Sequence, residues 1–160
     1  MRLLLKNLSF TVIVPATVAV YLPLLIARDR SLASGALLSV AVALVALGAA
    51  VYGWCVWDFA SFGRGTPFPL DAPRKLVIRG LYRYTRNPMY VGVLFVVLGW
   101  ALMFRAPDLL LYAVGVGMWF HLFIVLYEER RLGREFGGEY VEYCARVGRW
   151  LPRCGRRSSV

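Results

Sequence analysis

Charged side chains and the residues that build metal centres are scarce in this sequence. Only 18% of its 160 residues are charged, and it contains one histidine and three cysteines. The cysteines, Cys55, Cys144 and Cys154, show no C-x-x-C spacing and no paired histidine, so no metal site is predicted. No Ser-His-Asp constellation is apparent either. We expect Cys144 and Cys154 to face a reducing cytoplasm, and therefore expect no disulfide.

Long apolar runs make up most of the remaining chain. Hydrophobic residues are 59% of the sequence, and the mean hydropathy is +0.60. The runs contain no Lys, Arg or Glu and a single Asp, and they cover residues 8–27, 32–57, 89–104 and 107–127. A membrane-spanning helix needs about 20 apolar residues, and the core of an 18.0 kDa soluble domain is too small to bury four such runs. We predict an all-α membrane protein of about four transmembrane helices, forming one integral-membrane domain over residues 1–160.

The third run is the shortest, and a tight connector with Arg105 and Pro107 joins it to the fourth. These two runs are therefore expected to form a helical hairpin. Pro15 and Pro23 fall inside the first run, where a bilayer-embedded helix tolerates a kink.

The net charge of +10 is distributed unevenly along the chain. Sixteen of the 19 Lys and Arg residues lie in the amino end, the 58–88 segment and the tail, whereas only Arg28, Arg30 and Arg105 lie in the opposite connections. The positive-inside rule then places both termini and the 58–88 segment in the cytoplasm, as in a multi-pass protein of a bacterial inner membrane. The basic residues also suit anionic headgroups, at about 1 kcal/mol each. The bilayer is the predicted partner of this charge, and nucleic acid is not.

The segment from Lys75 to Gly92 reads KLVIRGLYRYTRNPMYVG, which is unusual for a plain connector. Pro88 suits the first position of a helix, whose free amide groups would attract a carboxylate or phosphate. Arg83 and Arg86 strengthen the positive field there. Three tyrosines offer flat faces to a heteroaromatic ring, and they are Tyr82, Tyr84 and Tyr90. The alternative is an interfacial aromatic belt with basic flanking residues.

A second polar segment, residues 127–152, begins with the adjacent carboxylates Glu128 and Glu129 at the end of the fourth run. Four apolar or aromatic residues recur after them at helical spacing and predict a cytoplasmic amphipathic helix, and they are Leu132, Phe136, Tyr140 and Tyr143. Glu128 would then lie at the junction of two helices. Alternatively, the acids of this segment pair with nearby arginines, as fits Glu135, Glu139 and Glu142.

His121 is the only histidine, and it lies two helical turns before Glu128 in the fourth run. Polar groups inside a membrane often mark a functional site. A neutral histidine hydrogen-bonded across helices is the alternative interpretation.

Together, these two segments resemble the isoprenylcysteine carboxyl methyltransferase family and, more loosely, the integral-membrane phospholipid N-methyltransferases. The family pattern has Arg-His-Pro-x-Tyr-x-Gly before a helical hairpin, then Glu-Glu, Phe-Gly-x-x-Tyr-x-x-Tyr, and a closing Val and Pro. Here these motifs read Arg86-Asn87-Pro88-Met89-Tyr90-Val91-Gly92, then Glu128-Glu129, then Phe136-Gly137-Gly138-Glu139-Tyr140-Val141-Glu142-Tyr143, then Val147 and Pro152. The resemblance covers roughly the second half of the chain.

The resemblance implies a cytoplasm-facing S-adenosylmethionine site within residues 75–150, with S-adenosylhomocysteine as product. By motif position, the residues it implies for the cofactor are Lys75, Tyr82, Arg83, Tyr84, Thr85, Arg86, Asn87, Tyr90, Phe95, Val96, Val97, Leu98 and Glu128. Candidates for positioning the reactants are Asn87, Tyr90 and Glu128. His121 and Ile124 are candidates for contact with the acceptor.

Two positions depart from the family pattern, and the second of them concerns the acceptor. Asn87 replaces the family's histidine, and Ile124 stands where the prenylcysteine enzymes resemble one another in having an arginine linked to substrate recognition. The predicted function is methyl transfer from S-adenosylmethionine to a lipophilic or lipidated acceptor. The alternatives are phospholipid N-methylation, an NADPH-dependent protein like the sterol reductases, which the same region also resembles, and a non-enzymatic four-helix scaffold. No oligomeric state is predicted.

Overall fold

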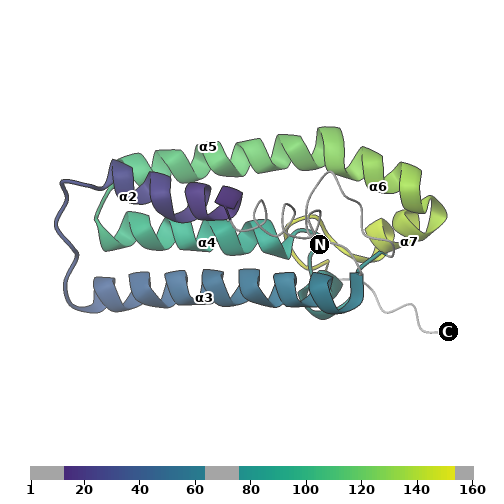
Figure 1. The fold of residues 1–160 in the computed structure, drawn as a ribbon, viewed down its shortest axis with the longest axis horizontal. Helices are drawn as coiled ribbons and strands as arrows, with labels where there is room; N and C mark the ends of the chain where they lie inside the picture. The colour runs from purple at the N-terminus through teal and green to yellow at the C-terminus, as the bar shows by residue number, and fades with distance from the viewer. Residues whose placement is uncertain (1–12, 64–75, 154–160) are drawn as a thin grey trace.

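The computed structural model describes residues 13–63 and 76–153, and every regular element in this part of the chain is helical. Long helices lie side by side, and the two short helices of residues 129–146 lie at one end of the bundle (Figure 1). In chain order the elements are η1 (Thr17–Tyr21), α2 (Leu22–Ile26), α3 (Ala36–Asp58), η2 (Phe59–Gly63), η3 (Gly80–Arg83), α4 (Pro88–Met103), α5 (Pro107–Phe123), η4 (Ile124–Glu128), α6 (Glu129–Phe136) and α7 (Gly138–Arg146).

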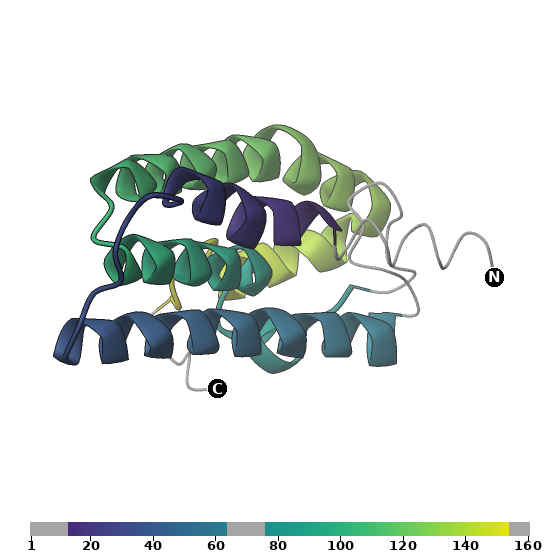
Figure 2. The ribbon, with the colours of Figure 1, turned by 60° about the vertical axis from the view of Figure 1, so that its left-hand side comes forward.

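Helix α4 is the centre of the bundle because α3 packs on one side of it and α5 on the other (Figures 1 and 2). Its contact with α3 runs backbone to backbone through small residues. A Cβ atom on Gly48 of α3 would lie 2.5 Å from the carbonyl oxygen of Gly92, and one on Gly99 of α4 would lie 3.0 Å from that of Ala41. Because apolar side chains gain little from leaving lipid for an apolar interface, such close approach is how membrane helices associate.

The first helix, Ile13–Ile26, lies against α4 and α5 and contains Pro23, which has no N–H to donate. In its π-helical turn the Leu22 amide donates to the Thr17 carbonyl. The following nitrogen, that of Pro23, lies where a donor to the Val18 or Ala19 carbonyl would be, but it carries no hydrogen. Two side chains replace the missing donor: Trp100 Nε1 donates to Ala19 at 2.9 Å, and the Tyr112 hydroxyl donates to Val18 at 2.9 Å. Neighbouring helices thus satisfy the carbonyls that a proline leaves open, as an apolar environment requires.

The predicted hairpin is present, since only residues 104–106 separate α4 from α5. The predicted amphipathic helix takes a different form. Helix α6 continues α5 through η4 as one rod, Pro107–Phe136, and the chain then turns at Gly137, whose φ of 51° favours glycine. Helix α7 folds back so that Tyr140 and Tyr143 pack on Leu132 and Leu76. The four regularly spaced residues therefore belong to two short helices, with Leu132 and Phe136 in α6 and Tyr140 and Tyr143 in α7.

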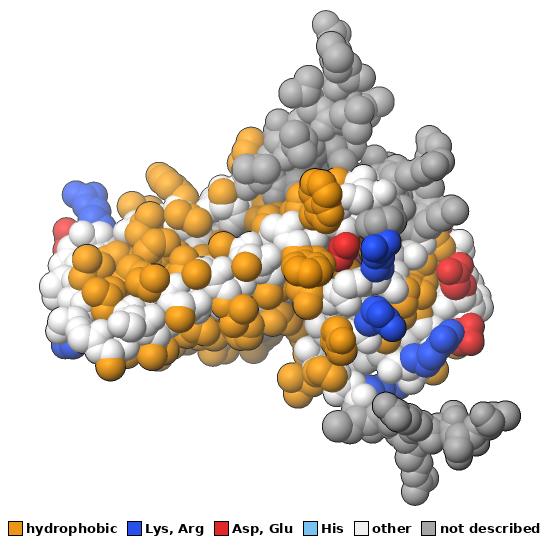
Figure 3. All heavy atoms as spheres, turned by 90° about the horizontal axis from the view of Figure 1, so that it is seen from below, with side chains coloured by type: hydrophobic (Ala, Val, Ile, Leu, Met, Phe, Trp, Pro, Cys, Tyr) orange, Lys and Arg blue, Asp and Glu red, His pale blue; other side chains and the backbone are white. Residues whose placement is uncertain are grey.

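Two helices in the described part of the chain are long and apolar enough to cross a membrane, Ala36–Ser61 and Pro107–Phe136. The other two predicted spans correspond to shorter apolar helices, Ile13–Ile26 and Pro88–Met103. Large apolar side chains point outward from the rods, such as Leu111 at 75% exposure and Trp119 at 68%. Hydrophobic side chains cover the body of the molecule in Figure 3, and charged ones gather toward its two ends.

The packing of α3 on α4 generates a prediction. Gly48→Ala pushes a methyl group into the α4 backbone, so it is expected to destabilise the protein by about 1–3 kcal/mol. The control is Gly53→Ala on the same helix, where a Cβ atom meets nothing within 4 Å. Thermal unfolding in detergent, followed by tryptophan fluorescence, measures both. Equal unfolding midpoints for the two variants would contradict the backbone contact.

Candidate functional site

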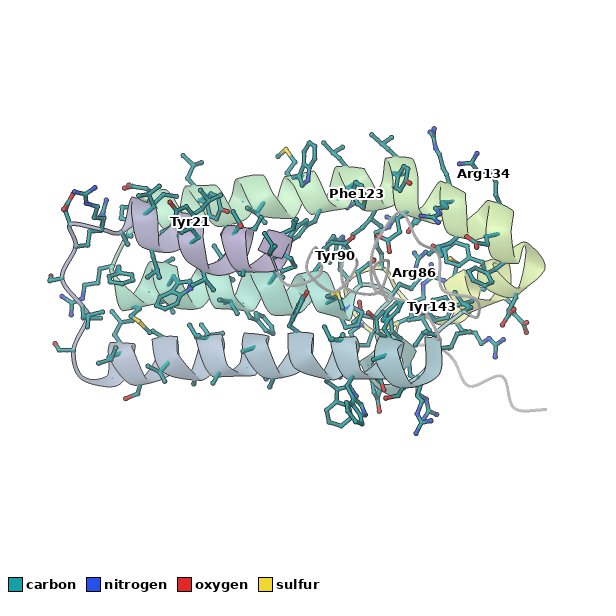
Figure 4. All side chains as sticks on the ribbon, in the orientation of Figure 1. Tyr21, Arg86, Tyr90, Phe123, Arg134 and Tyr143 are labelled. Atoms are coloured by element: carbon teal, nitrogen blue, oxygen red, sulfur yellow. The ribbon has the colours of Figure 1, made fainter. Side chains whose placement is uncertain are left out.

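The polar residues of both predicted segments meet at the end of the bundle that carries α6 and α7. Arg86, Tyr90 and Tyr143 all lie in this region in Figure 4, although they come from the loop before α4, from α4 and from α7. Residues that meet here are up to 64 positions apart in the sequence. The hairpin of α4 and α5 brings them together, because α4 begins and α5 ends at the same end of the bundle.

Tyr90 and Glu128 form the contact at the centre of this region. The Tyr90 hydroxyl, from the first turn of α4, donates to Glu128 Oε2 at 2.9 Å. The Tyr90 ring also packs on Phe120 of α5, with 4.7 Å between ring centroids. Glu128 ends the π-helical segment η4, and such segments are often found at functional sites. One carboxylate oxygen is thus held in place by a neutral donor, while a carboxylate can accept further hydrogen bonds.

The neighbouring acid, Glu129, binds two arginines that are far apart in sequence. Arg149 Nε donates to Oε1 at 2.8 Å and its Nη2 donates to Oε2 at 2.9 Å, a bidentate pair. Arg86 Nη1 lies 3.0 Å from the same Oε1. The side chains of Arg86 and Glu129 are only 11% and 20% exposed, so these contacts are screened less than surface pairs. The hydrogen bond to Glu129 raises the pKa of Arg149 and keeps it charged.

Backbone contacts reinforce the junction of the loop and the carboxyl-terminal segment. The Arg86 amide donates to the Gly148 carbonyl at 2.9 Å. The carbonyl of Arg149 accepts two hydrogen bonds, from the Thr85 hydroxyl at 3.0 Å and from Asn87 Nδ2 at 3.1 Å. Asn87 is buried, and its side chain does not cap α4. The structure therefore places this positioning candidate in a contact that fixes the loop.

Tyr82 and Tyr143 connect the same loop to α3 and α7. The Tyr143 hydroxyl donates to the Tyr82 carbonyl at 2.7 Å, and the Tyr82 ring packs in a core cluster with Cys55 and the edge of Phe59. Burial raises the pKa of both tyrosine hydroxyls, so they stay protonated. The ring of Tyr82 is covered by core residues. Tyr84 is 61% exposed, so its ring has the more accessible face.

The other predicted cofactor residues lie at varied positions. Arg83 is exposed, Phe95 and Leu98 are half-buried, and Val96 and Val97 are buried in α4, where Val96 meets Gly48 of α3. Lys75 lies outside the described residues.

The structure places neither predicted acceptor residue in the Tyr90–Glu128 hydrogen bond. His121 is exposed on α5, where its Nδ1 accepts a hydrogen bond from Trp150 Nε1 at 3.2 Å. Ile124 is 1% exposed and belongs to the packed interior. Arg149, Gly148 and Trp150 were not among the predicted site residues, because nothing in a basic tail marks which arginine turns inward.

The partly buried acid Glu129 generates a second prediction. Glu129→Gln removes the charge that two partly buried arginines share, so it is expected to cost about 2 kcal/mol of unfolding free energy. Glu142→Gln is the control, since Glu142 pairs with Arg146 at 2.8 Å but both side chains are more than two-thirds exposed, and such pairs contribute little. Chemical denaturation in detergent compares them. The account is wrong if the control loses as much stability as Glu129→Gln.

Comparison with known proteins extends this picture. A family model described as phospholipid methyltransferase matches residues 37–139. Protein-S-isoprenylcysteine O-methyltransferase B of Arabidopsis thaliana is 38% identical to the chain over 79 residues, which are 49% of this chain and 40% of that protein. The chain thus covers less than half the length of this curated relative. No solved structure matches the chain.

The family match begins in α3, contains Arg86, Tyr90, Glu128 and Glu129, and ends in α7 before Arg149. The resemblance that the two polar segments predicted is therefore confirmed. Long apolar helices with outward-facing side chains agree with integration in a membrane. Since the match covers well over half of its residues, the chain belongs to the phospholipid methyltransferase family.

Proposed function

We propose that the chain is an integral-membrane methyltransferase that transfers a methyl group from S-adenosylmethionine to a lipophilic acceptor. The observation that carries this proposal is the Tyr90–Glu128 contact, at 2.9 Å, between the two segments that bear the family motifs. The name of the plant relative supports the reaction class. We further propose a single domain with its cofactor-binding part at residues 75–150.

The residues at the site fit the chemistry of this cofactor. S-adenosylmethionine supplies a methyl group on a sulfonium cation, and it also carries a carboxylate, an amino group, ribose hydroxyls and an adenine. The Glu128 carboxylate, fixed by Tyr90, suits the amino or hydroxyl donors. Helix α4 begins at Pro88 with no side-chain cap, so its first amides suit a carboxylate. The exposed ring of Tyr84 suits the adenine or the cation.

In this proposal the chain acts chiefly by positioning and by exclusion of water. Displacement at a methyl carbon needs the attacking atom in line at about 3–3.5 Å, so oriented binding supplies much of the acceleration. Glu128 and Tyr90 orient one reactant at the end of the bundle. The acceptor approaches from the bilayer along the apolar helices, and a dry site favours reaction of a cation with an anionic nucleophile.

The proposed orientation in the membrane follows from the proposed cofactor, because S-adenosylmethionine is a cytoplasmic metabolite. We propose that the end with α6 and α7 faces the cytoplasm, and that the two shorter apolar helices complete four spans. The basic residues of the 58–88 segment and the tail support this orientation, and a bacterial inner membrane fits it.

Phospholipid N-methylation is the second candidate, and a specific observation favours it. Ile124 is apolar and 1% exposed at the position where the prenylcysteine enzymes have an arginine. Arg86 and Arg149 are both engaged by Glu129. A carboxylate acceptor would therefore find neither of these guanidinium groups available, whereas a lipid amine would not need one.

Binding of S-adenosylhomocysteine tests the cofactor site. Isothermal titration of detergent-purified protein is expected to give saturable heat, and Glu128→Gln is expected to weaken binding by about tenfold or more, as for loss of a charged hydrogen bond. Glu139→Gln, on the exposed face of α7, is the control and is expected to bind normally. Absence of heat with wild-type protein would contradict the proposal and favour a scaffold, and heat with NADPH instead would favour a reductase.

Product analysis identifies the acceptor. The protein is incubated with isotope-labelled S-adenosylmethionine and either total lipid extract or a farnesylcysteine derivative, and mass spectrometry records which species gains a methyl group. Labelled phospholipid is expected for the N-methylation candidate and a labelled methyl ester for the prenylcysteine candidate. Label in neither lipophilic pool, with cofactor binding intact, would contradict a lipophilic acceptor.

A further inference from the structure

One face of the rod formed by α5, η4 and α6 is exposed along much of its length. Its side chains change from apolar to basic near the end of the bundle. Its exposed positions recur every four residues, at Met118, Leu122, Leu126, Arg130 and Arg134. The π-helical turn within this stretch holds more residues than an α-helical turn and helps to keep positions four apart in line. An outward apolar stripe therefore runs directly into two outward guanidinium groups.

Arg130 and Arg134 have no acid within reach along their helix. The positions three and four residues before and after Arg130 are Leu126, Tyr127, Gly133 and Arg134. Those around Arg134 are Arg130, Arg131, Gly137 and Gly138. Among the described residues no ion pair involves either side chain, and Arg134 Nε donates only to the Arg130 carbonyl, at 3.3 Å.

Other arginines near this end have carboxylate partners. Arg131 lies 3.8 Å from Glu135, and Arg146 lies 2.8 Å from Glu142, both one helical turn away. At the opposite end of the bundle, Arg30 pairs with Asp108. Two like charges one turn apart repel each other, so the Arg130–Arg134 pair is arranged to gain from an anion supplied by another molecule.

We propose that Arg130 and Arg134 bind the phosphate of an anionic phospholipid whose acyl chains lie along Leu126, Leu122 and Met118. Arg134 projects from the outer side of α6, away from Arg86 and Tyr90 (Figure 4). An arginine can keep its aliphatic stem on apolar surface while its guanidinium reaches the headgroup, and its planar fork matches a phosphate. On the same rod, Glu128 contacts Tyr90 and Glu129 contacts Arg86, toward the interior of the bundle. This lipid site is therefore separate from the methyl-transfer site.

The apolar stripe favours a lipid over a free phosphate ion. Leu126 and Met118 are 54% and 61% exposed, and Trp119 beside them is 68% exposed. A bilayer lipid covers this surface and places its phosphate one or two turns further along the rod, where the guanidinium groups are. A soluble anion would gain the charge contact alone.

Native mass spectrometry of the full-length protein in detergent tests the site with two probes, phosphatidylglycerol and phosphatidylcholine with identical acyl chains. The wild-type protein is expected to retain phosphatidylglycerol preferentially. Each of Arg130→Gln and Arg134→Gln is expected to lower that retention by about fivefold, as for loss of one basic contact at a membrane surface. The double variant is expected to treat the two lipids alike.

Arg146→Gln removes the same charge from a paired arginine and is the matched control. Its preference for phosphatidylglycerol is expected to match that of wild type. An equal loss in this control would mean that net charge alone attracts the lipid, and an unchanged preference in the double variant would mean that the lipid binds elsewhere. Displacement of the lipid by millimolar glycerol phosphate would show a site for the free anion. Each of these three results overturns the proposal, and the two single variants decide the matter if the double variant fails to fold.

Discussion

The carboxylate of Glu129 joins three segments of the chain at one point and adds ion pairs to the backbone contacts between two of them. It lies at the start of α6 and binds Arg86 from the loop before α4 and Arg149 from the carboxyl-terminal segment. Because the group is mostly buried, loss of one partner would leave charge away from water, which is costly. Glu128 precedes it directly, so the same anchor fixes the last turn of η4 and the carboxylate that meets Tyr90. The candidate site depends on this junction more than on any one helix.

Much of the helical framework could be predicted from the sequence because long apolar runs identify membrane helices by composition alone. Uninterrupted apolar runs indicated the helices, Pro88 marked the start of α4, and the short connector at Arg105 indicated the hairpin. The meeting of the two polar segments followed from that hairpin and from the family motifs. A carboxylate directly after an apolar run marks Glu128 as a candidate in the sequence, and Tyr90 is the partner that the fold supplies.

The remaining features depend on contacts that local pattern does not encode. The spacing of Leu132, Phe136, Tyr140 and Tyr143 fits one helix, but the Gly137-Gly138 pair lets the chain reverse and buries the same residues between two helices. Arg149 is one of many tail arginines, and the hydrogen bonds that the loop before α4 makes to Gly148 and Arg149 place it beside Glu129. Likewise, the indole of Trp100 pairs with a carbonyl 81 residues away because Pro23 leaves it open. The last two are polar groups satisfied by residues distant in sequence, which periodicity cannot reveal.

One partly buried acid, Glu129, couples the loop before α4 to the carboxyl-terminal segment. Hydrogen–deuterium exchange with mass spectrometry tests this coupling most directly, because the Arg86 amide is bonded to Gly148 across that junction. In the Glu129→Gln protein, peptides covering residues 79–87 and 147–153 should both exchange faster than in wild type, while α3 stays protected. If only one of the two segments is affected, or neither, the junction does not depend on Glu129 and the account fails.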